Sequence, residues 1–153
     1  MLRRLRRSKY IISPSGKLKF LLATLLSYAN DLHYSNMLTR LQNSLAHGVV
    51  IRYMNSYFVV PDYHVSMILD PAYEAWFWNY ITIGEGDVVI DVGAHIGKYS
   101  ITLGKIICPR DLVIAIEPHP INFYFLRLNI RINNMINIVK PYNVASGIKM
   151  VHQ

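Results

Sequence analysis

The chain has 153 residues, of which 52% are hydrophobic and 16% are charged. This length suits a single domain, and the composition excludes a chain that is too polar to form a core. The single cysteine, Cys108, excludes an internal disulfide and favours a reducing compartment, so we predict a cytoplasmic protein. The six histidines and Cys108 lack metal-ligand spacing, so we predict no metal site.

The net charge of +7 is concentrated at the N-terminus. Residues 1–19 contain seven basic residues and no acidic residue, whereas the rest of the chain contains nine of each. We therefore predict a basic N-terminal arm over residues 1–19. A solvated tail is the simplest interpretation of such a run. The alternative is contact with nucleic acid or an anionic membrane through four arginines, Arg3, Arg4, Arg6 and Arg7.

Residues 20–86 are predicted to form a helical and β-hairpin region. The apolar run 20–26 follows a basic segment, as in a signal peptide, but no small-residue cleavage site follows it. The run is also shorter than the ~20 residues that a membrane span needs. We predict a helix over residues 17–28 that packs on the domain, with surface membrane contact through its leucines as the alternative.

A second helix is predicted over residues 36–45, where apolar residues recur at helical spacing. The β-rich runs 49–53 and 57–60 then predict a hairpin that turns around Asn55 and Ser56.

Asp70 and Pro71 predict the start of a further helix over residues 72–80, because aspartate is a good N-cap and proline suits the first helical position. Four aromatic residues recur there at helical spacing: Tyr73, Trp76, Phe77 and Tyr80. Core packing is the favoured interpretation of this spacing, and the alternative is that these aromatic residues line a substrate cleft.

The stretch from residue 86 to residue 100 carries the main functional signal. Residues 88–90 are apolar and predict a buried parallel strand, which ends at Asp91. Gly93 and Gly97 follow, and we predict a helix over residues 98–107. A strand, an acid, a glycine-bearing loop and a helix start are together typical of a nucleotide-cofactor site at the carboxyl end of a strand.

Spacing excludes two familiar glycine loops at this position. A dinucleotide fingerprint that starts at Gly93 requires glycine where the chain has His95 and Lys98. A P-loop requires four residues between its glycines, but three residues separate Gly93 from Gly97, and Tyr99 follows the lysine. The pattern that remains is Asp-x-Gly-x-x-x-Gly after a strand.

A second apolar run, residues 112–116, predicts the next strand and ends at Glu117. Glu117 follows Gly93 by 24 residues, close to the ~20 expected for a ribose-binding acid. A carboxylate accepts two hydrogen bonds, and a ribose offers two neighbouring hydroxyls. A helix over residues 120–133 follows, and then a third strand over residues 135–145 that is interrupted at Pro141.

These elements predict an α/β fold with about three parallel strands in a partial cofactor-binding domain over residues 87–153. The segment from Asp91 to Gly97 resembles the first motif of class I S-adenosylmethionine-dependent methyltransferases. It is most similar to the FkbM family, in which asparagine is usual at the position of His95. The sequence Glu-Pro-x-Pro-x-x-Phe from Glu117 to Phe123 is similar to the next FkbM motif.

The resemblance covers about residues 48–147 and implies a Rossmann-like fold with S-adenosylmethionine as cofactor. It implies that Gly93 and Gly97 let the backbone approach the ligand, and that Glu117 binds the ribose. Asp91 is expected to bond loop amides or the cofactor's amino group, with a strand-end cap as the alternative. The cofactor-binding residues that it implies are Asp91, Gly93, Ala94, His95, Gly97, Glu117, Pro118, His119, Asn143 and Val144.

The class I fold implies about seven strands, and the next FkbM landmark is absent after Gly147. We therefore expect a truncated FkbM-type enzyme that transfers a methyl group to an oxygen of an unknown small-molecule or glycan acceptor, with no catalytic base assigned. One alternative is an inactive cofactor-binding remnant, or one part of a split enzyme that a second chain completes. A further alternative is a basic-arm protein that binds nucleic acid or membrane on a methyltransferase scaffold.

Overall fold

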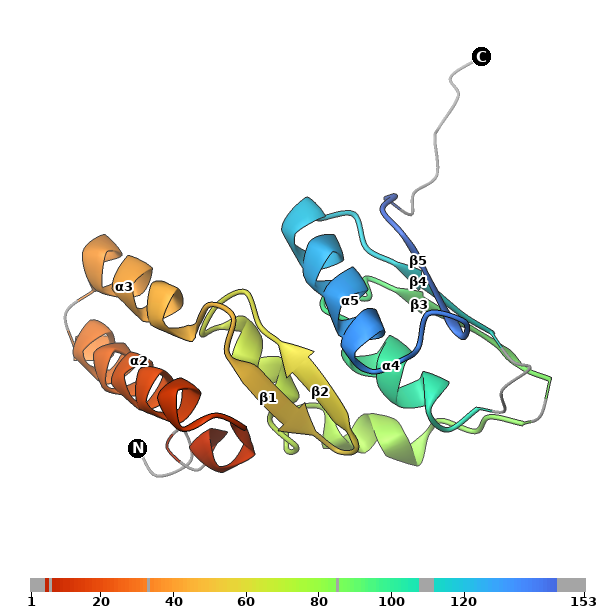
Figure 1. The fold of residues 1–153 in the computed structure, drawn as a ribbon, viewed down its shortest axis with the longest axis horizontal. Coiled ribbons are helices and arrows are strands. Elements are labelled where there is room, and N and C mark those ends of the chain that lie inside the picture. The colour runs from red at the N-terminus through yellow and green to blue at the C-terminus, as the bar shows by residue number, and fades with distance from the viewer. Residues whose placement is uncertain (1–4, 6, 33, 85, 108–111, 146–153) are drawn as a thin grey trace, which may run out of the picture. The chain divides into compact units, whose positions relative to one another are not determined.

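The computed structural model describes residues 5, 7–32, 34–84, 86–107 and 112–145. It divides into two compact units, residues 1–82 (unit 1) and residues 83–153 (unit 2), and each is described by itself. Figure 1 shows the elements of both units along the chain.

The first part of unit 1 is a pair of helices that lie side by side, α2 (Pro14–Leu32) and α3 (Asn36–Ala46) (Figure 1). Helix α2 buries Phe20, Ala23 and Thr24 and is longer than the predicted 17–28. Within the described residues, neither these helices nor any other is long and apolar enough to cross a membrane.

A β-hairpin follows, with β1 (Val50–Tyr53) antiparallel to β2 (Ser56–Val59). Val50 pairs with Val59 and Tyr53 pairs with Ser56, so the turn consists of Met54 and Asn55. The hairpin was predicted, but its turn lies one residue earlier than the predicted Asn55 and Ser56, and Met54 adopts a left-handed conformation with φ 50°.

The predicted helix over residues 72–80 is wrong. The structure has a short 3-10 helix, η3 (Ala75–Asn79), and Glu74 before it is left-handed with φ 53°. Asp70 does not cap a helix; its Oδ1 accepts a hydrogen bond from the Ala72 N–H in a local turn. Core packing of the aromatic residues is also wrong, because Trp76 is 60% exposed and Tyr80 is 79% exposed.

The predicted arm places Arg7 in solvent, and the structure contradicts this. Arg7 belongs to η1 (Arg7–Tyr10) and is buried, with its Nε atom 3.4 Å from the Asp70 carboxylate. Two further arginines of the predicted arm, Arg3 and Arg4, lie outside the described residues, as does Arg6. A second short 3-10 helix, η2 (Val65–Leu69), precedes Asp70.

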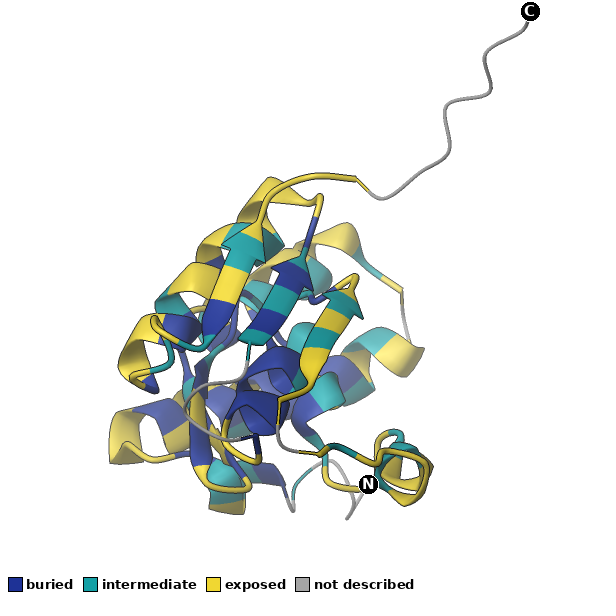
Figure 2. Ribbon diagram, turned by 90° about the vertical axis from the view of Figure 1, so that its right-hand side faces the viewer, coloured by how far each residue is buried: buried dark blue, intermediate teal, exposed yellow. Residues whose placement is uncertain are grey.

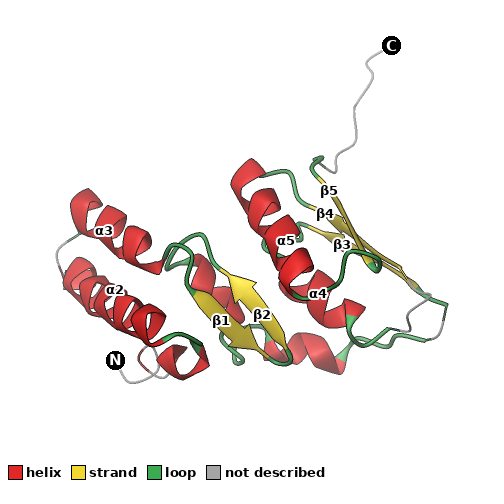
Figure 3. Cartoon of the chain, in the orientation of Figure 1, coloured by secondary structure: helices red, strands yellow, loops and turns green. Residues whose placement is uncertain are grey.

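Unit 2 is a βαβαβ arrangement, as predicted, with β3 (Val88–Val92), β4 (Leu112–Ile116) and β5 (Val139–Tyr142) in that order. Neighbouring strands are parallel. Helix α4 (Lys98–Gly104) joins the first two strands and α5 (Pro120–Ile132) joins the last two (Figure 3). The fold class is therefore Rossmann-like α/β.

The core of unit 2 lies on one face of this sheet. Val113, Ala115 and Val139 are buried there, and the chain packs α4 and α5 near them. On the opposite face of β3, every second residue is exposed, with Ile90 at 60% (Figure 2). Side chains alternate between the two faces of a strand. Among the described residues, only the face of the sheet that α4 and α5 cover is therefore fully packed.

Strand β5 is not interrupted at Pro141, contrary to the prediction. Pro141 is the register partner of Ala115, inside the continuous strand. The carbonyl oxygens of Ile138 and Tyr142 accept hydrogen bonds from the N–H groups of Val113 in β4 and of Glu117 directly after it. Successive residues of a strand face opposite sides, so the nitrogen of Pro141 points away from β4. Proline lacks an N–H, and it is tolerated because β5 is at the edge of the described sheet.

Candidate cofactor-binding site

The loop between β3 and α4 folds back onto the end of β4. The N–H groups of Gly93 and Ala94 both donate to the carbonyl oxygen of Ile116, each at 2.9 Å. Three loop residues have positive φ angles: Gly93 at 80°, His95 at 53° and Gly97 at 92°. This tight course is why glycine is needed at two of these positions.

Glu117 links the loop after β3 to the loop after β4. Its side chain is 4% exposed, and its Oε2 atom accepts a hydrogen bond from the His95 N–H at 2.8 Å. Its Oε1 atom accepts one from the His119 N–H, also at 2.8 Å. The carboxylate therefore joins the loops that follow β3 and β4, and each oxygen retains further acceptor capacity for a ligand hydroxyl.

Asp91 holds the first turn of α4. Its Oδ2 atom accepts hydrogen bonds from the N–H of Ser100 at 3.0 Å and from the hydroxyl of the same residue. Burial raises the pKa of the Asp91 carboxyl above its ordinary 3.8, the bonds from Ser100 oppose this shift, and the charge of Glu117 adds to it. The structure therefore has Asp91 bonded to the first turn of α4, and not to an amide of the glycine loop as the sequence analysis expected.

A pH-dependent effect on stability follows from the raised pKa of Asp91. The contribution of this group is full below its ordinary pKa of 3.8 and is lost as the pH rises through the raised value, because the folded chain holds the proton more tightly. Asp91→Asn removes the titration and keeps an oxygen acceptor. We expect the free energy of unfolding of the wild type, relative to Asp91→Asn, to fall as the pH rises above the ordinary pKa of 3.8.

Urea unfolding of both chains at several pH values tests this expectation. Ser100→Ala is the control, because it removes one hydrogen bond and leaves the titrating carboxyl in place. A free energy of unfolding of the wild type that rises with pH relative to that of Asp91→Asn would contradict the assignment.

The other predicted site residues gather at the same strand ends. The Asn143 side chain donates to the carbonyl oxygens of Glu117 at 2.8 Å and Pro118 at 3.1 Å, which ties the end of β5 to the loop after β4. Val144 follows it and is 52% exposed. Pro118 and His119 are exposed, and His119 precedes α5 without a side-chain capping bond. The structure therefore brings all ten predicted residues to one edge of the sheet.

Two supporting residues were missed by the sequence analysis. Ser100 receives no mention there, although a hydroxyl three positions into a helix is a common partner for an acid. Asn129 is fully buried on α5, and its side chain donates to the carbonyl oxygen of Ile96 in the glycine loop at 3.0 Å. A polar residue among the apolar positions of α5 was the signal, since buried amides need hydrogen-bond partners.

The edge has the chemistry of a nucleoside-binding site. It carries a buried carboxylate, exposed loop residues, and free space beside Gly93, where an added Cβ would meet no atom within 4 Å. No group of three or more histidine, cysteine or acidic residues in the described part of the chain is placed to hold a metal ion. Ligands bind outside the carboxyl ends of parallel strands in open α/β sheets.

The architecture is that of a class I, S-adenosylmethionine-dependent methyltransferase domain. More particularly, residues 80–150 match the model of the TRM5/TYW2 methyltransferase domain. The predicted FkbM type is not supported by this match, and neither is transfer to oxygen. The acid-and-glycine motif around Asp91 is local, so it indicates the class without separating its families.

Similar proteins are much longer than the matched region. One relative is the tRNA(Phe) (4-demethylwyosine(37)-C(7)) aminocarboxypropyltransferase of Methanocaldococcus jannaschii, which is 40% identical to this chain over 55 residues. These residues make up 36% of this chain and 22% of that protein. The structure of PH0793 from Pyrococcus horikoshii aligns with a TM-score of 0.53 at 25% identity, over 65% of this chain and 37% of that one. Trm5b from Pyrococcus abyssi aligns with a TM-score of 0.46 at 24% identity, over 62% and 27%.

Proposed function

We propose that this chain contributes the S-adenosylmethionine site of a tRNA-modifying transferase of the TRM5/TYW2 type. The observation that carries the proposal is the match of residues 80–150 to that domain, since this range includes the candidate site at the carboxyl ends of β3, β4 and β5. The printed name of the curated relative supports tRNA as the substrate.

In this proposal, Glu117 binds the ribose hydroxyls while its carboxylate continues to hold the two loops together. Gly93 and Ala94 supply a close backbone approach beside the open space at residue 93. Asn143 and Val144 lie beside the adenine, and His95, Gly97, Pro118 and His119 border the cofactor. Asp91 acts by fixing α4 through Ser100.

The transferred group has two candidates. In methyl transfer, a nucleophilic atom of a tRNA base attacks the methyl carbon, the carbon–sulfur bond breaks toward sulfur, and the neutral product is S-adenosylhomocysteine. In aminocarboxypropyl transfer, the attack falls on the carbon that joins the aminocarboxypropyl group to sulfur, that carbon–sulfur bond breaks toward sulfur, and the product is methylthioadenosine. In both reactions the tRNA base releases a proton to solvent. The family model favours the first, and the name of the curated relative favours the second.

Incubation of the chain with S-adenosylmethionine and an unmodified tRNA transcript separates these candidates. We expect S-adenosylhomocysteine and a tRNA that gains one methyl mass, both measured by mass spectrometry. Formation of methylthioadenosine would instead identify the reaction as aminocarboxypropyl transfer. If the chain binds the cofactor but forms neither S-adenosylhomocysteine nor methylthioadenosine above the level of a protein-free control, turnover by the 153-residue chain is contradicted.

A further inference from the structure

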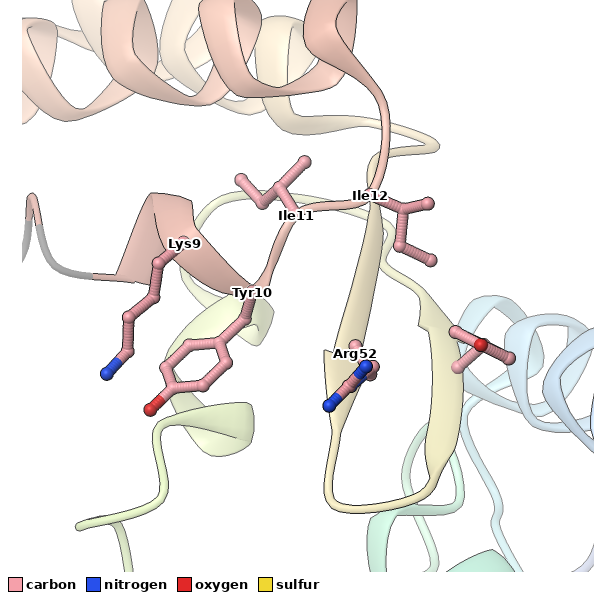
Figure 4. Close-up of a pocket in the computed structure, with 6 residues that line it drawn as sticks. Lys9, Tyr10, Ile11, Ile12 and Arg52 are labelled. Atoms are coloured by element: carbon pink, nitrogen blue, oxygen red, sulfur yellow. The ribbon is translucent and has the colours of Figure 1, made fainter.

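Unit 1 contains an open groove of about 520 Å³ (Figure 4). Its lining comprises two basic residues, two tyrosines and two isoleucines: Lys9, Tyr10, Ile11, Ile12, Arg52 and Tyr57. Among the residues that the structure describes, no acidic residue lines this groove. A groove that combines cations with aromatic rings points to a ligand that carries both negative charge and flat, stackable surfaces.

The hairpin register explains how these side chains reach one surface. Arg52 and Tyr57 are directly opposite each other across β1 and β2, so they share a face of the hairpin. Their strand neighbours Ile51, Tyr53 and Phe58 are buried on the other face. The hairpin therefore buries its apolar residues and presents a cation beside a phenol.

The segment before α2 extends this surface by a third strand-like stretch. Ile11 forms an antiparallel bridge with Ile51, and the Ile12 N–H donates to the Val50 carbonyl oxygen at 3.3 Å. Tyr10 is the last residue of η1 and directly precedes Ile11, and it lines the same groove as Arg52. Ile11 is buried, whereas Ile12 is exposed, and Figure 4 shows both next to Tyr10 along the chain and near Arg52 of β1. The surface thus combines an arginine with two tyrosines.

The charges on this surface are available to a ligand. Lys9 and Arg52 are exposed, and within the described residues neither forms an ion pair. The Lys9 Nζ atom lies 4.7 Å from the centroid of the Tyr10 ring, which keeps the cation at the groove. Unit 1 as a whole contains nine basic residues and four acidic residues, so the surrounding field also attracts an anion.

We infer that this groove binds a single-stranded segment of RNA. Lys9 and Arg52 are placed to contact successive phosphates, and Tyr10 and Tyr57 are placed to stack on unpaired bases. Stacking platforms set in a basic groove are the usual means by which proteins bind single strands. The choice of RNA over DNA rests on the proposed function, whereas the stacking and phosphate chemistry does not.

An anionic membrane is the competing partner for such a cationic surface. Membrane-surface binding depends on a continuous apolar face that enters the acyl region. Here Ile12, at 51% exposed, is the one strongly exposed aliphatic residue of the groove, and the tyrosines bring hydroxyl groups to it. The groove therefore fits a nucleic acid strand better than a lipid surface.

Fluorescence anisotropy with a labelled, unstructured RNA of about 12 nucleotides tests the inference, in the absence of S-adenosylmethionine. The groove variants are Arg52→Gln and Tyr57→Ala. Arg40→Gln on α3 is the charge-matched control and Tyr34→Ala is the ring-matched control, because both residues are exposed and neither lines the groove. Circular dichroism establishes that each variant is folded.

We expect Tyr57→Ala to weaken RNA binding by on the order of tenfold, and both controls to stay within about twofold of the wild type. Arg52→Gln is also expected to reduce the magnitude of the log–log salt slope by about 0.7, since one phosphate contact is lost. Equal losses in groove and control variants would overturn the inference, because binding would then be diffuse.

Two other results would also overturn it. One is a folded wild-type chain that does not bind RNA, and the other is Arg52-dependent binding to phosphatidylserine vesicles without RNA binding. Calorimetry with S-adenosylhomocysteine is run on the same samples. A wild-type chain that binds S-adenosylhomocysteine but not RNA would overturn this inference alone, whereas a chain that binds RNA but not S-adenosylhomocysteine would contradict the cofactor site of the proposed function alone.

Discussion

Glu117→Ala is expected to lower the affinity of the chain for S-adenosylhomocysteine by at least about 100-fold. Hydrogen bonds to a charged group contribute about 1.5–3 kcal/mol each, and two ribose hydroxyls would lose their acceptor. The substitution also leaves the N–H groups of His95 and His119 without the carboxylate that now accepts from them. Isothermal titration calorimetry measures the loss.

Two variants make this result specific. Glu117→Gln keeps the size of the side chain but replaces one acceptor oxygen with a donor, so we expect an intermediate loss. Asp87→Asn is the charge control, because Asp87 lies before the opposite end of β3, where it accepts a hydrogen bond from Gly84. Affinity of Glu117→Ala within about threefold of the wild type would refute the ribose-binding role.

Gly97→Ala is expected to destabilise unit 2 by about 2–5 kcal/mol. Residue 97 has φ 92°, a conformation that costs a residue with a Cβ about 1–2 kcal/mol. The added Cβ would also lie 2.7 Å from Leu126 Cδ1 and 3.0 Å from Ile101 Cδ1, and overpacking of this kind costs about 1–3 kcal/mol. Chemical denaturation followed by circular dichroism measures the change.

Gly93→Ala is the matched control for this prediction. Gly93 is also left-handed, with φ 80°, but an added Cβ there would meet no atom within 4 Å. We expect it to cost only the conformational part, about 1–2 kcal/mol. If the two alanine variants are equally stable, the contact between the glycine loop and α5 is not as tight as the structure has it.

The sequence predicted unit 2 well because its signals are local. Apolar runs that end in Asp91 and Glu117 define strand ends, and Gly93 and Gly97 occupy positions where φ is positive. The roles within the site were less accessible. The bonds from Glu117 to the His95 and His119 amides depend on how two loops face each other, which no spacing along the chain reveals.

Unit 1 was harder to predict for a different reason. The Asp70 and Pro71 pair is a strong local signal for a helix start, yet the left-handed Glu74 ends any helical course after one turn. The basic run predicted an arm with all its side chains in solvent, but Arg7 is buried and forms an ion pair with Asp70. The groove beside Arg52 was not foreseen, because its residues come together only through the bridge between Ile11 and Ile51.

The most direct test of the central claim is an amide NMR titration of the 153-residue chain with S-adenosylhomocysteine. If the carboxyl ends of β3, β4 and β5 form the cofactor site, the largest shift changes will fall on the amides of residues 91–98, on those of Glu117 and His119, and on those of residues 143–144. A folded chain with no shift changes, or with changes centred in unit 1, would contradict the assignment.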